Sequence, residues 1–221
     1  MREGRSARAG ARWLLPSQRG WSPRLYEGFF TRTRWGRSLR REEAATIGAA
    51  LLGCELQGRP VLEIGAGTGT YTDVLVRAGA LVEVREPSAA MRSYLSARAR
   101  REQWTSVRIG DGGLPADLRV SSRFALVLAI GVLNYLPDLG TALTTMARIL
   151  DRDGAIIVNV PTAERSVGAR YRRIELLGGR RVFCRGRNEV ESAARHAGLH
   201  VAHGPLRAGV TDVYHLRPRT I

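Results

Sequence analysis

Residues 61–69 read Val-Leu-Glu-Ile-Gly-Ala-Gly-Thr-Gly and combine a carboxylate with three glycines. A short apolar run leads into the glycines, and Glu63 lies two residues before the first of them. Glycines permit a tight turn and let a ligand approach the backbone, while amides at the start of a following helix offer hydrogen bonds. Thr70 stands where the dinucleotide fingerprint Gly-x-Gly-x-x-Gly requires its third glycine. The spacing therefore predicts a ligand-binding loop that differs from a dinucleotide site.

Further polar residues follow the next apolar runs of the chain. Glu86-Pro87-Ser88 comes after the run that begins at Leu81, and Asp111-Gly112 comes after Val107–Ile109. Tyr135 follows the long run Phe124–Ile130 and is the candidate catalytic residue. It is suited to orienting an acceptor or taking its proton, although a tyrosine with an ordinary pKa is a poor base near pH 7. Packing, or anchoring a lid, is the alternative role for Tyr135.

The hydrophobic pattern predicts strands and helices in alternation, and these elements would position the residues named above. Buried strands are expected over residues 61–64, 81–84, 107–109, 124–130 and 155–160, and helices over 40–52, 71–78, 91–103 and 139–150. Such alternation predicts a Rossmann-like, doubly wound sheet in a three-layer α/β/α arrangement. The sheet is expected to be mostly parallel, with ligands at the carboxyl ends of its strands.

The last third of the chain does not continue the regular alternation of strands and helices. Residues 162–187 are rich in arginine and glycine and are interpreted as an insertion or lid. A turn is expected at Asp151–Gly154, and an Asn188-x-x-Glu191 capping box is expected to open a helix that ends before Gly198. Residues 199–203 and 210–217 are expected to close the sheet as an antiparallel pair. Some lid arginines suit recognition of a carboxylate or phosphate, although a solvated loop is favoured: Arg165, Arg170, Arg172, Arg173, Arg180 and Arg181.

Taken together, the segments resemble the class I S-adenosylmethionine-dependent methyltransferases. Val61–Gly69 is similar to that family's first motif, (V/L)(L/V)(E/D)xGxGxG, and Glu86–Met91 is similar to its E-P-S-x-x-M segment. Phe124–Ala129 resembles F-D-L-V, with Ala125 in place of the usual Asp, and Leu150–Gly154 resembles the L-K-P-G-G turn. Arg85, directly before Glu86, is unusual at the end of a buried strand. The resemblance covers about residues 42–160.

The resemblance implies S-adenosylmethionine as cofactor, S-adenosylhomocysteine as product and no metal. In the family, the acid after the second strand holds both ribose hydroxyls and an Asp after the third strand lies near the adenine amine, which are roles for Glu86 and Asp111. An N-terminal segment covers the cofactor in similar enzymes, and Tyr26 is the candidate for that task. The cofactor-binding residues implied are Glu63, Gly65, Ala66, Gly67, Gly69, Glu86, Pro87, Ser88, Met91, Asp111, Gly112, Ala129 and Tyr26.

Charge divides the chain unevenly. All 35 basic residues are arginine, and the formal net charge is +15. We expect an arginine-rich arm and cofactor-covering segment over residues 1–41 and a methyltransferase domain over residues 42–221. Such an arm is suited to binding a polyanion, but a disordered tail or an over-extended reading frame is favoured. Two cysteines in no metal or disulfide spacing, and no long apolar run, predict a cytoplasmic protein without a membrane partner.

Three functions fit these residues. The leading prediction is methyl transfer to the O, N or C atom of a small molecule, in bacterial secondary metabolism. The second is an RNA or protein methyltransferase that uses the basic arm, although the chain lacks the (D/N/S)-P-P-(Y/F/W) and Pro-Cys motifs of nucleic-acid methyltransferases. The third is a cofactor-binding protein that catalyses another reaction or serves as a partner subunit. The oligomeric state is left open.

Overall fold

The computed structural model describes residues 22–115, 118, 120, 122–177 and 179–219, and a seven-stranded sheet runs through its centre. The strand order is β3-β2-β1-β4-β5-β7-β6. The first five strands are parallel, and β7 is antiparallel to both of its neighbours. The strands are β1 (Pro60–Ile64), β2 (Leu81–Arg85), β3 (Val107–Gly110), β4 (Phe124–Ala129), β5 (Leu150–Pro161), β6 (Leu199–Ala208) and β7 (Thr211–Pro218). The expected doubly wound, mostly parallel sheet is confirmed.

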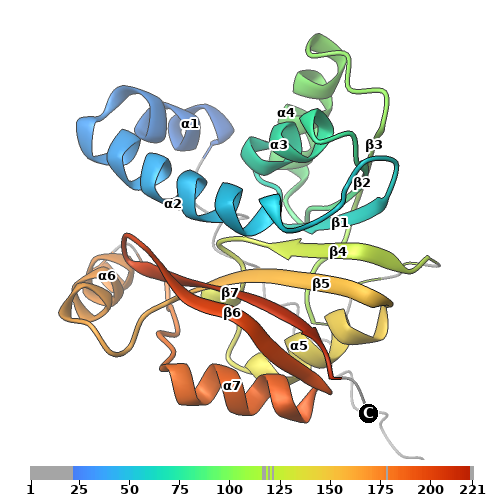
Figure 1. Cartoon of the computed structure of the whole chain (residues 1–221). Helices are drawn as coiled ribbons and strands as arrows, with labels where there is room; N and C mark the ends of the chain where they lie inside the picture. The colour runs from blue at the N-terminus through green and yellow to red at the C-terminus, as the bar shows by residue number, and fades with distance from the viewer. Residues whose placement is uncertain (1–21, 116–117, 119, 121, 178, 220–221) are drawn as a thin grey trace, which may run out of the picture.

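Helices cover both faces of the sheet (Figure 1). On one face lie α2 (Arg34–Leu52), α3 (Thr70–Arg77) and α4 (Ala89–Arg101), and on the other lie α5 (Leu139–Arg148) and α7 (Arg187–His196). A short 3₁₀ helix, η2 (Leu133–Tyr135), follows β4. Two further helices, α1 (Pro23–Arg32) and α6 (Ser166–Leu177), lie at one end of the sheet. The result is the three-layer arrangement that the alternating pattern predicts.

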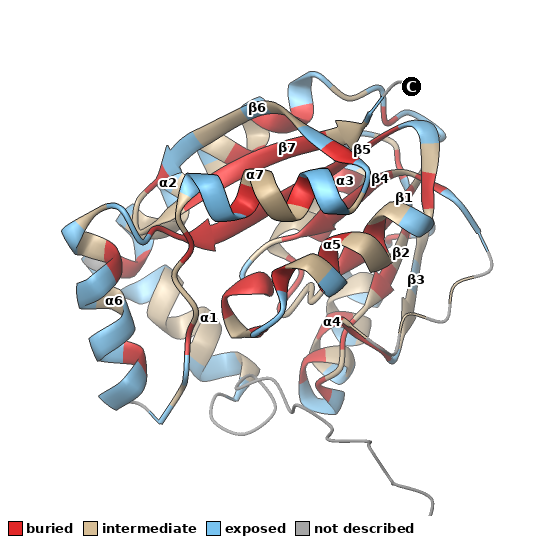
Figure 2. Cartoon of the chain, turned by 90° about the horizontal axis from the view of Figure 1, so that it is seen from below, coloured by how far each residue is buried: buried red, intermediate tan, exposed pale blue. Residues whose placement is uncertain are grey.

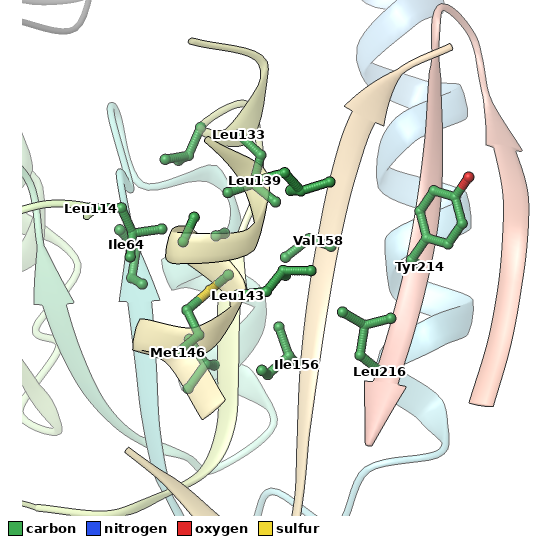
Figure 3. Close-up of a cluster of buried hydrophobic side chains, with 14 of the residues drawn as sticks. Ile64, Leu114, Leu133, Leu139, Leu143, Met146, Ile156, Val158, Tyr214 and Leu216 are labelled. Carbon is green, nitrogen blue, oxygen red and sulfur yellow. The ribbon is translucent and has the colours of Figure 1, made fainter. Parts of the chain in front are cut away.

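Each face of the sheet has its own apolar core, as expected where helices bury both sides of a parallel sheet. Strand β4 contributes Val127 to one core and Leu126 to the other, because successive side chains point to opposite faces. Figure 3 shows the core beneath α5, where Leu143 and Met146 pack against Ile156 of β5. The two cores hold the carboxyl ends of the central strands in fixed positions.

Several expected element boundaries were wrong. Helix α2 begins at Arg34 rather than Arg40, since Thr33 caps it by accepting from the Gly36 amide. The expected turn at 151–154 is an irregularity inside β5, whose partners shift from Phe124↔Leu150 to Leu126↔Ala155. The first 21 residues, with the interpretations placed on them as a polyanion-binding or disordered arm, lie outside the described residues.

The expected capping box at Asn188 was also wrong. Helix α7 starts one residue earlier, at Arg187, and its N-cap residue Gly186 contributes no side-chain hydrogen bond. Instead, the Glu164 carboxylate accepts a hydrogen bond from the Arg187 amide at 2.7 Å. A side chain from 23 residues earlier thus satisfies an amide that a local cap usually serves.

Residues 162–187, interpreted from the sequence as an insertion with a solvated loop favoured, contain helix α6 and are fastened at both ends. Arg165 pairs with Asp212 at 2.7 Å and donates to the Gly209 and Thr211 carbonyls. At the other end the buried Arg185 donates to the carbonyls of Leu136 and Pro137. These two arginines have structural partners, so they are not available to a substrate.

Gly168 fixes the start of α6 against the end of β5, and its replacement should be destabilising. A Cβ at position 168 would overlap the Thr162 carbonyl oxygen, which belongs to the backbone and cannot move away cheaply. We expect Gly168→Ala to lower the free energy of unfolding by about 2 kcal/mol or more, measured by urea denaturation. Gly48→Ala is the matched control, because a Cβ there has open space and alanine favours a helix by up to about 1 kcal/mol. Equal stability of the two variants would contradict the close contact.

Candidate active site

The glycine loop between β1 and α3 has the geometry that its sequence predicts. Gly65, Gly67 and Gly69 all have positive φ angles, of 71°, 57° and 84°. Side chains at 65 and 69 would overlap Val132 and Leu95, whereas a Cβ at Gly67 would meet nothing within 4 Å. Gly69 also caps α3 without a side-chain hydrogen bond. The loop therefore offers open backbone beside the start of a helix, which suits close approach of a ligand.

Two buried carboxyl groups lie beside this loop. Glu86, 2% exposed, accepts hydrogen bonds from the Gly67 amide at 2.9 Å and the Ser88 amide at 2.8 Å. Glu63, 3% exposed, accepts from the Thr72 hydroxyl at 2.5 Å. Burial raises the pKa of both groups, and that of Glu63 rises to about 7 with a further contribution from the Glu86 charge. One carboxylate thus holds the middle of the loop, and the other lies under the start of α3.

The segment after β2 is ordered by the same groups. The Ser88 hydroxyl caps α4 by accepting from the Met91 amide, and both side chains are buried. Pro87 lies beside Gly113. Ser88 and Met91 therefore have the capping and packing role that such residues play at a helix start.

Asp111 and Gly112 are brought next to this segment by a single arginine. Arg92 donates to the Glu86 carbonyl at 2.7 Å and pairs with Asp111 at 2.8 Å. The Asp111 side chain is 73% exposed and also accepts from the Gly112 amide at 2.9 Å. Two of the expected cofactor acids, Glu86 and Asp111, are therefore connected through one guanidinium group.

Ala129 and Ala66 lie on different sides of the loop. Ala129 ends β4 with a fully buried side chain in one core, while the half-buried Ala66 packs against the other core. Only the backbone of Ala129 is therefore placed to face a ligand.

Helix α1 lies across the glycine loop. Glu27 of this helix accepts from the Thr68 hydroxyl at 2.7 Å and pairs with Arg40 at 2.8 Å. Tyr26, one residue before, has its pKa raised by burial and by the charge of Glu43. The neighbouring Glu27 thus connects the helix that carries Tyr26 to the glycine loop.

A second network, not predicted from the sequence, joins α2 to α3 and to the ends of β4 and β5. Glu43 accepts from Tyr71 at 2.8 Å and from the Asn159 side-chain amide at 3.0 Å. Asn159 in turn accepts from the Gly131 amide after β4 at 2.7 Å. Two signals mark these residues in the sequence. Glu43 lies four residues before Ile47 on the apolar face of its helix, and Asn159 is the only polar residue in the apolar run 155–160.

Tyr135 lies on the other side of the site, beneath α6. Its hydroxyl hydrogen-bonds to Tyr171 of α6 and to the side chain of Asn134, and Asn134 also donates to the Tyr171 hydroxyl at 3.5 Å. Burial raises the pKa of Tyr135, and the nearby Glu175 raises it further. The side-chain oxygen of Asn134 is buried with no hydrogen-bond partner among the described residues. The Asn134 side-chain oxygen can therefore accept a hydrogen bond from a ligand. The hydroxyls of Tyr135 and Tyr171 lie beside the same side chain.

The site residues form two clusters, one around the glycine loop and one around Tyr135. The glycine loop, Glu63 and Glu86 lie under α1, whereas Asn134 and Tyr135 lie under α6, which contributes Tyr171. Among the described residues, no group of three or more His, Cys, Asp or Glu side chains is placed to hold a metal ion. The described helices include none that is both long and apolar enough to span a membrane.

Comparison with known proteins agrees with this geometry. A family model described as "Methyltransferase domain" matches residues 37–203. Demethylmenaquinone methyltransferase from Tropheryma whipplei (strain Twist) is 31% identical over 101 residues, which is 46% of this chain and 41% of that protein. The chain thus matches less than half the length of this curated relative.

Solved structures show the same fold at low sequence identity. Magnesium protoporphyrin IX methyltransferase from Synechocystis PCC 6803, solved with bound SAH, has a TM-score of 0.69 at 16% identity, covering 85% of this chain and 88% of that one. The CcbJ methyltransferase from Streptomyces caelestis has a TM-score of 0.67 at 20% identity, covering 90% and 98%. The chain therefore belongs to the methyltransferase-domain family, and its fold is that of the class I S-adenosylmethionine-dependent methyltransferases.

Proposed function

We propose that this protein transfers the methyl group of S-adenosylmethionine to a small-molecule acceptor. The observation that carries the proposal is the open glycine loop with the buried Glu86 carboxylate bonded to its central amide. The residues present fit the cofactor, because an acidic pair beside open backbone suits a ligand that carries a cationic sulfonium and ribose hydroxyls. Bound there, the cofactor supplies an activated methyl group.

The residues proposed to hold the cofactor divide by task. Glu86 accepts hydrogen bonds from the ribose hydroxyls, and Glu63 supports the glycine loop and contributes its own charge. Asp111 lies near the adenine, and Tyr26 on α1 covers the site. The backbone of the glycine loop and of the segments at the ends of β2, β3 and β4 supplies the remaining contacts, from Gly65, Ala66, Gly67, Gly69, Pro87, Ser88, Met91, Gly112 and Ala129.

The chain's contribution to chemistry is placement of the acceptor and exclusion of water. Tyr135 orients the acceptor rather than taking its proton, because a raised pKa leaves even less of the ionised form that could accept a proton near pH 7. The unpartnered Asn134 oxygen favours an acceptor that donates a hydrogen bond, such as a hydroxyl or an amine, because leaving it unpaired costs about 1–3 kcal/mol.

The class of acceptor is proposed from the similar proteins. Their names state magnesium protoporphyrin IX, mitomycin and demethylmenaquinone as acceptors, and all three are small molecules. We propose bacterial secondary metabolism as the setting and the cytoplasm as the compartment, where the two free cysteines, Cys54 and Cys184, stay reduced.

The test combines binding with product release. Calorimetry with S-adenosylmethionine is expected to show binding, and incubation with candidate hydroxyl- or amine-bearing small molecules is expected to release S-adenosylhomocysteine. Release with RNA or protein alone would reassign the acceptor class, and binding without release under any acceptor would favour a protein that does not transfer methyl groups. Absence of binding by the full chain would overturn the proposal.

A further inference from the structure

The outer face of α6 combines exposed arginines with exposed aliphatic side chains. Ile174, Leu176 and Leu177 are 46%, 66% and 89% exposed at the end of the helix. Arg170, Arg172 and Arg173 are exposed one to two turns before Leu177, and none of the ion pairs found among the described residues involves them. Figure 2 shows α6 exposed along most of its length, away from the buried sheet. We call these six residues the α6 tip surface.

Hydrogen bonds on the inner side of α6 keep the aliphatic side chains at its end exposed. Glu175, buried on the inner side between Ile174 and Leu176, pairs with Arg180 through two hydrogen bonds at 2.5 and 3.2 Å. The Arg180 amide also donates to the Glu175 carbonyl at 2.8 Å, so the chain is fastened directly after the helix. With Glu175 pointing inward, the neighbouring leucines must point outward. The fold therefore presents Leu176 and Leu177 to the surroundings.

The residue types of the α6 tip surface favour one class of binding partner over two others. A second copy of the same face, related by a twofold axis, would bring Arg172 and Arg173 against their own copies, and like charges repel. A nucleic acid would satisfy the arginines but would leave large aliphatic side chains without an apolar environment. An anionic lipid surface satisfies both, because aliphatic side chains insert below the head groups while arginines remain at their level.

We propose that the α6 tip surface docks the protein on a lipid bilayer that carries anionic head groups. With a helical rise of 1.5 Å per residue, Arg172 lies about 7 Å behind Leu177 along the helix axis, comparable with the depth of an interfacial helix. The inner side of the same helix carries Tyr171, which contacts Tyr135 in the acceptor half of the site. Docking of α6 would therefore place the acceptor half of the site next to the bilayer. This differs from the expectation of no membrane partner, which rested on the lack of a spanning segment.

Vesicle co-sedimentation with the full chain tests the proposal without any substrate. We expect binding to phosphatidylcholine vesicles that contain phosphatidylglycerol, and much weaker binding to phosphatidylcholine alone. The double variant Leu176→Gln, Leu177→Gln is expected to lower the partition coefficient about tenfold or more. The double variant Arg172→Gln, Arg173→Gln is expected to remove much of the preference for the anionic lipid and its sensitivity to salt.

Leu52→Gln is the matched control, because Leu52 is also 89% exposed but lies at the end of α2. It is expected to bind vesicles as the unchanged protein does. If the leucine pair on α6 can be replaced without loss, binding comes from charge alone, for example from the arginine-rich N-terminal residues, and the proposal is overturned. Absence of vesicle binding, or an equal loss with Leu52→Gln, would also overturn it. The result is independent of methyl transfer, so failure here leaves the proposed function standing.

Discussion

Glu86→Ala is expected to weaken S-adenosylmethionine binding at least tenfold, which corresponds to about 1.4 kcal/mol. The substitution removes two effects at once. It takes away the proposed acceptor of the ribose hydroxyls, and it leaves the amides of Gly67 and Ser88 without the carboxylate oxygens that they now contact at 2.9 and 2.8 Å. Glu86→Gln should lose most of the same affinity, because its NH₂ group would face one of these two N–H donors. Calorimetry with S-adenosylmethionine measures both variants.

Glu83→Gln is the control for this experiment. Glu83 lies three residues before Glu86, on β2, but is paired with Arg85 and is only partly buried. Its replacement should leave cofactor affinity within about twofold, as for most surface changes away from a site. If Glu86→Ala binds as tightly as the unchanged protein while remaining folded, Glu86 does not contact the cofactor and the assignment fails.

Glu63→Gln is expected to stabilise the protein at and above pH 7. Burial, with a contribution from Glu86, raises the pKa of Glu63 to about 7 from an ordinary value near 4.5. A carboxyl group whose folded pKa is raised keeps its proton in the folded state, so stability is full below pH 4.5 and is lost as the pH rises to about 7. The loss amounts to roughly 3 kcal/mol. Glutamine avoids this loss, because it stays neutral and can still accept from Thr72.

Urea denaturation across pH 4 to 8 tests this prediction. The unchanged protein should lose stability relative to Glu63→Gln between about pH 4.5 and pH 7, and the difference should be constant above that range. Glu55→Gln serves as the control, since Glu55 is exposed and should leave the pH dependence unaltered. Curves for Glu63→Gln that run parallel to those of the unchanged protein at every pH would show that Glu63 ionises normally in the folded state.

The parts of the fold and site that could be predicted from the sequence are those that depend on residues close together in the chain. The run Val61–Gly69 combines a buried strand, a glycine spacing and a helix start, and all three signals concern neighbours in the chain. The same holds for the parallel sheet, since each βαβ unit is a local alternation of patterns. Glu86 was identified in the same way, because the segment Glu86–Met91 directly after β2 resembles a family motif.

Contacts between distant segments could not be predicted. Glu43 and Asn159 are 116 residues apart, and only the packing of α2 on the strand ends brings them together. Tyr171 was hidden in a segment interpreted as an insertion, because the arginines and glycines there mask its helical pattern. The start of α7 depends in the same way on Glu164, a cap from outside the helix.

The short connection between α1 and α2 restricts how α1 can move away from the glycine loop. The two helices are separated by Thr33 alone, and Gly36 lies so close to the Phe29 carbonyl that a side chain there would overlap it. Rotation about the two torsion angles of Thr33 would carry α1 away from the glycine loop as one rigid body. Such a motion must break the hydrogen bond between Glu27 and Thr68 and the ion pair between Glu27 and Arg40, but it breaks no hydrogen bond of the sheet. The Glu27 side chain therefore joins α1 both to the glycine loop and to α2.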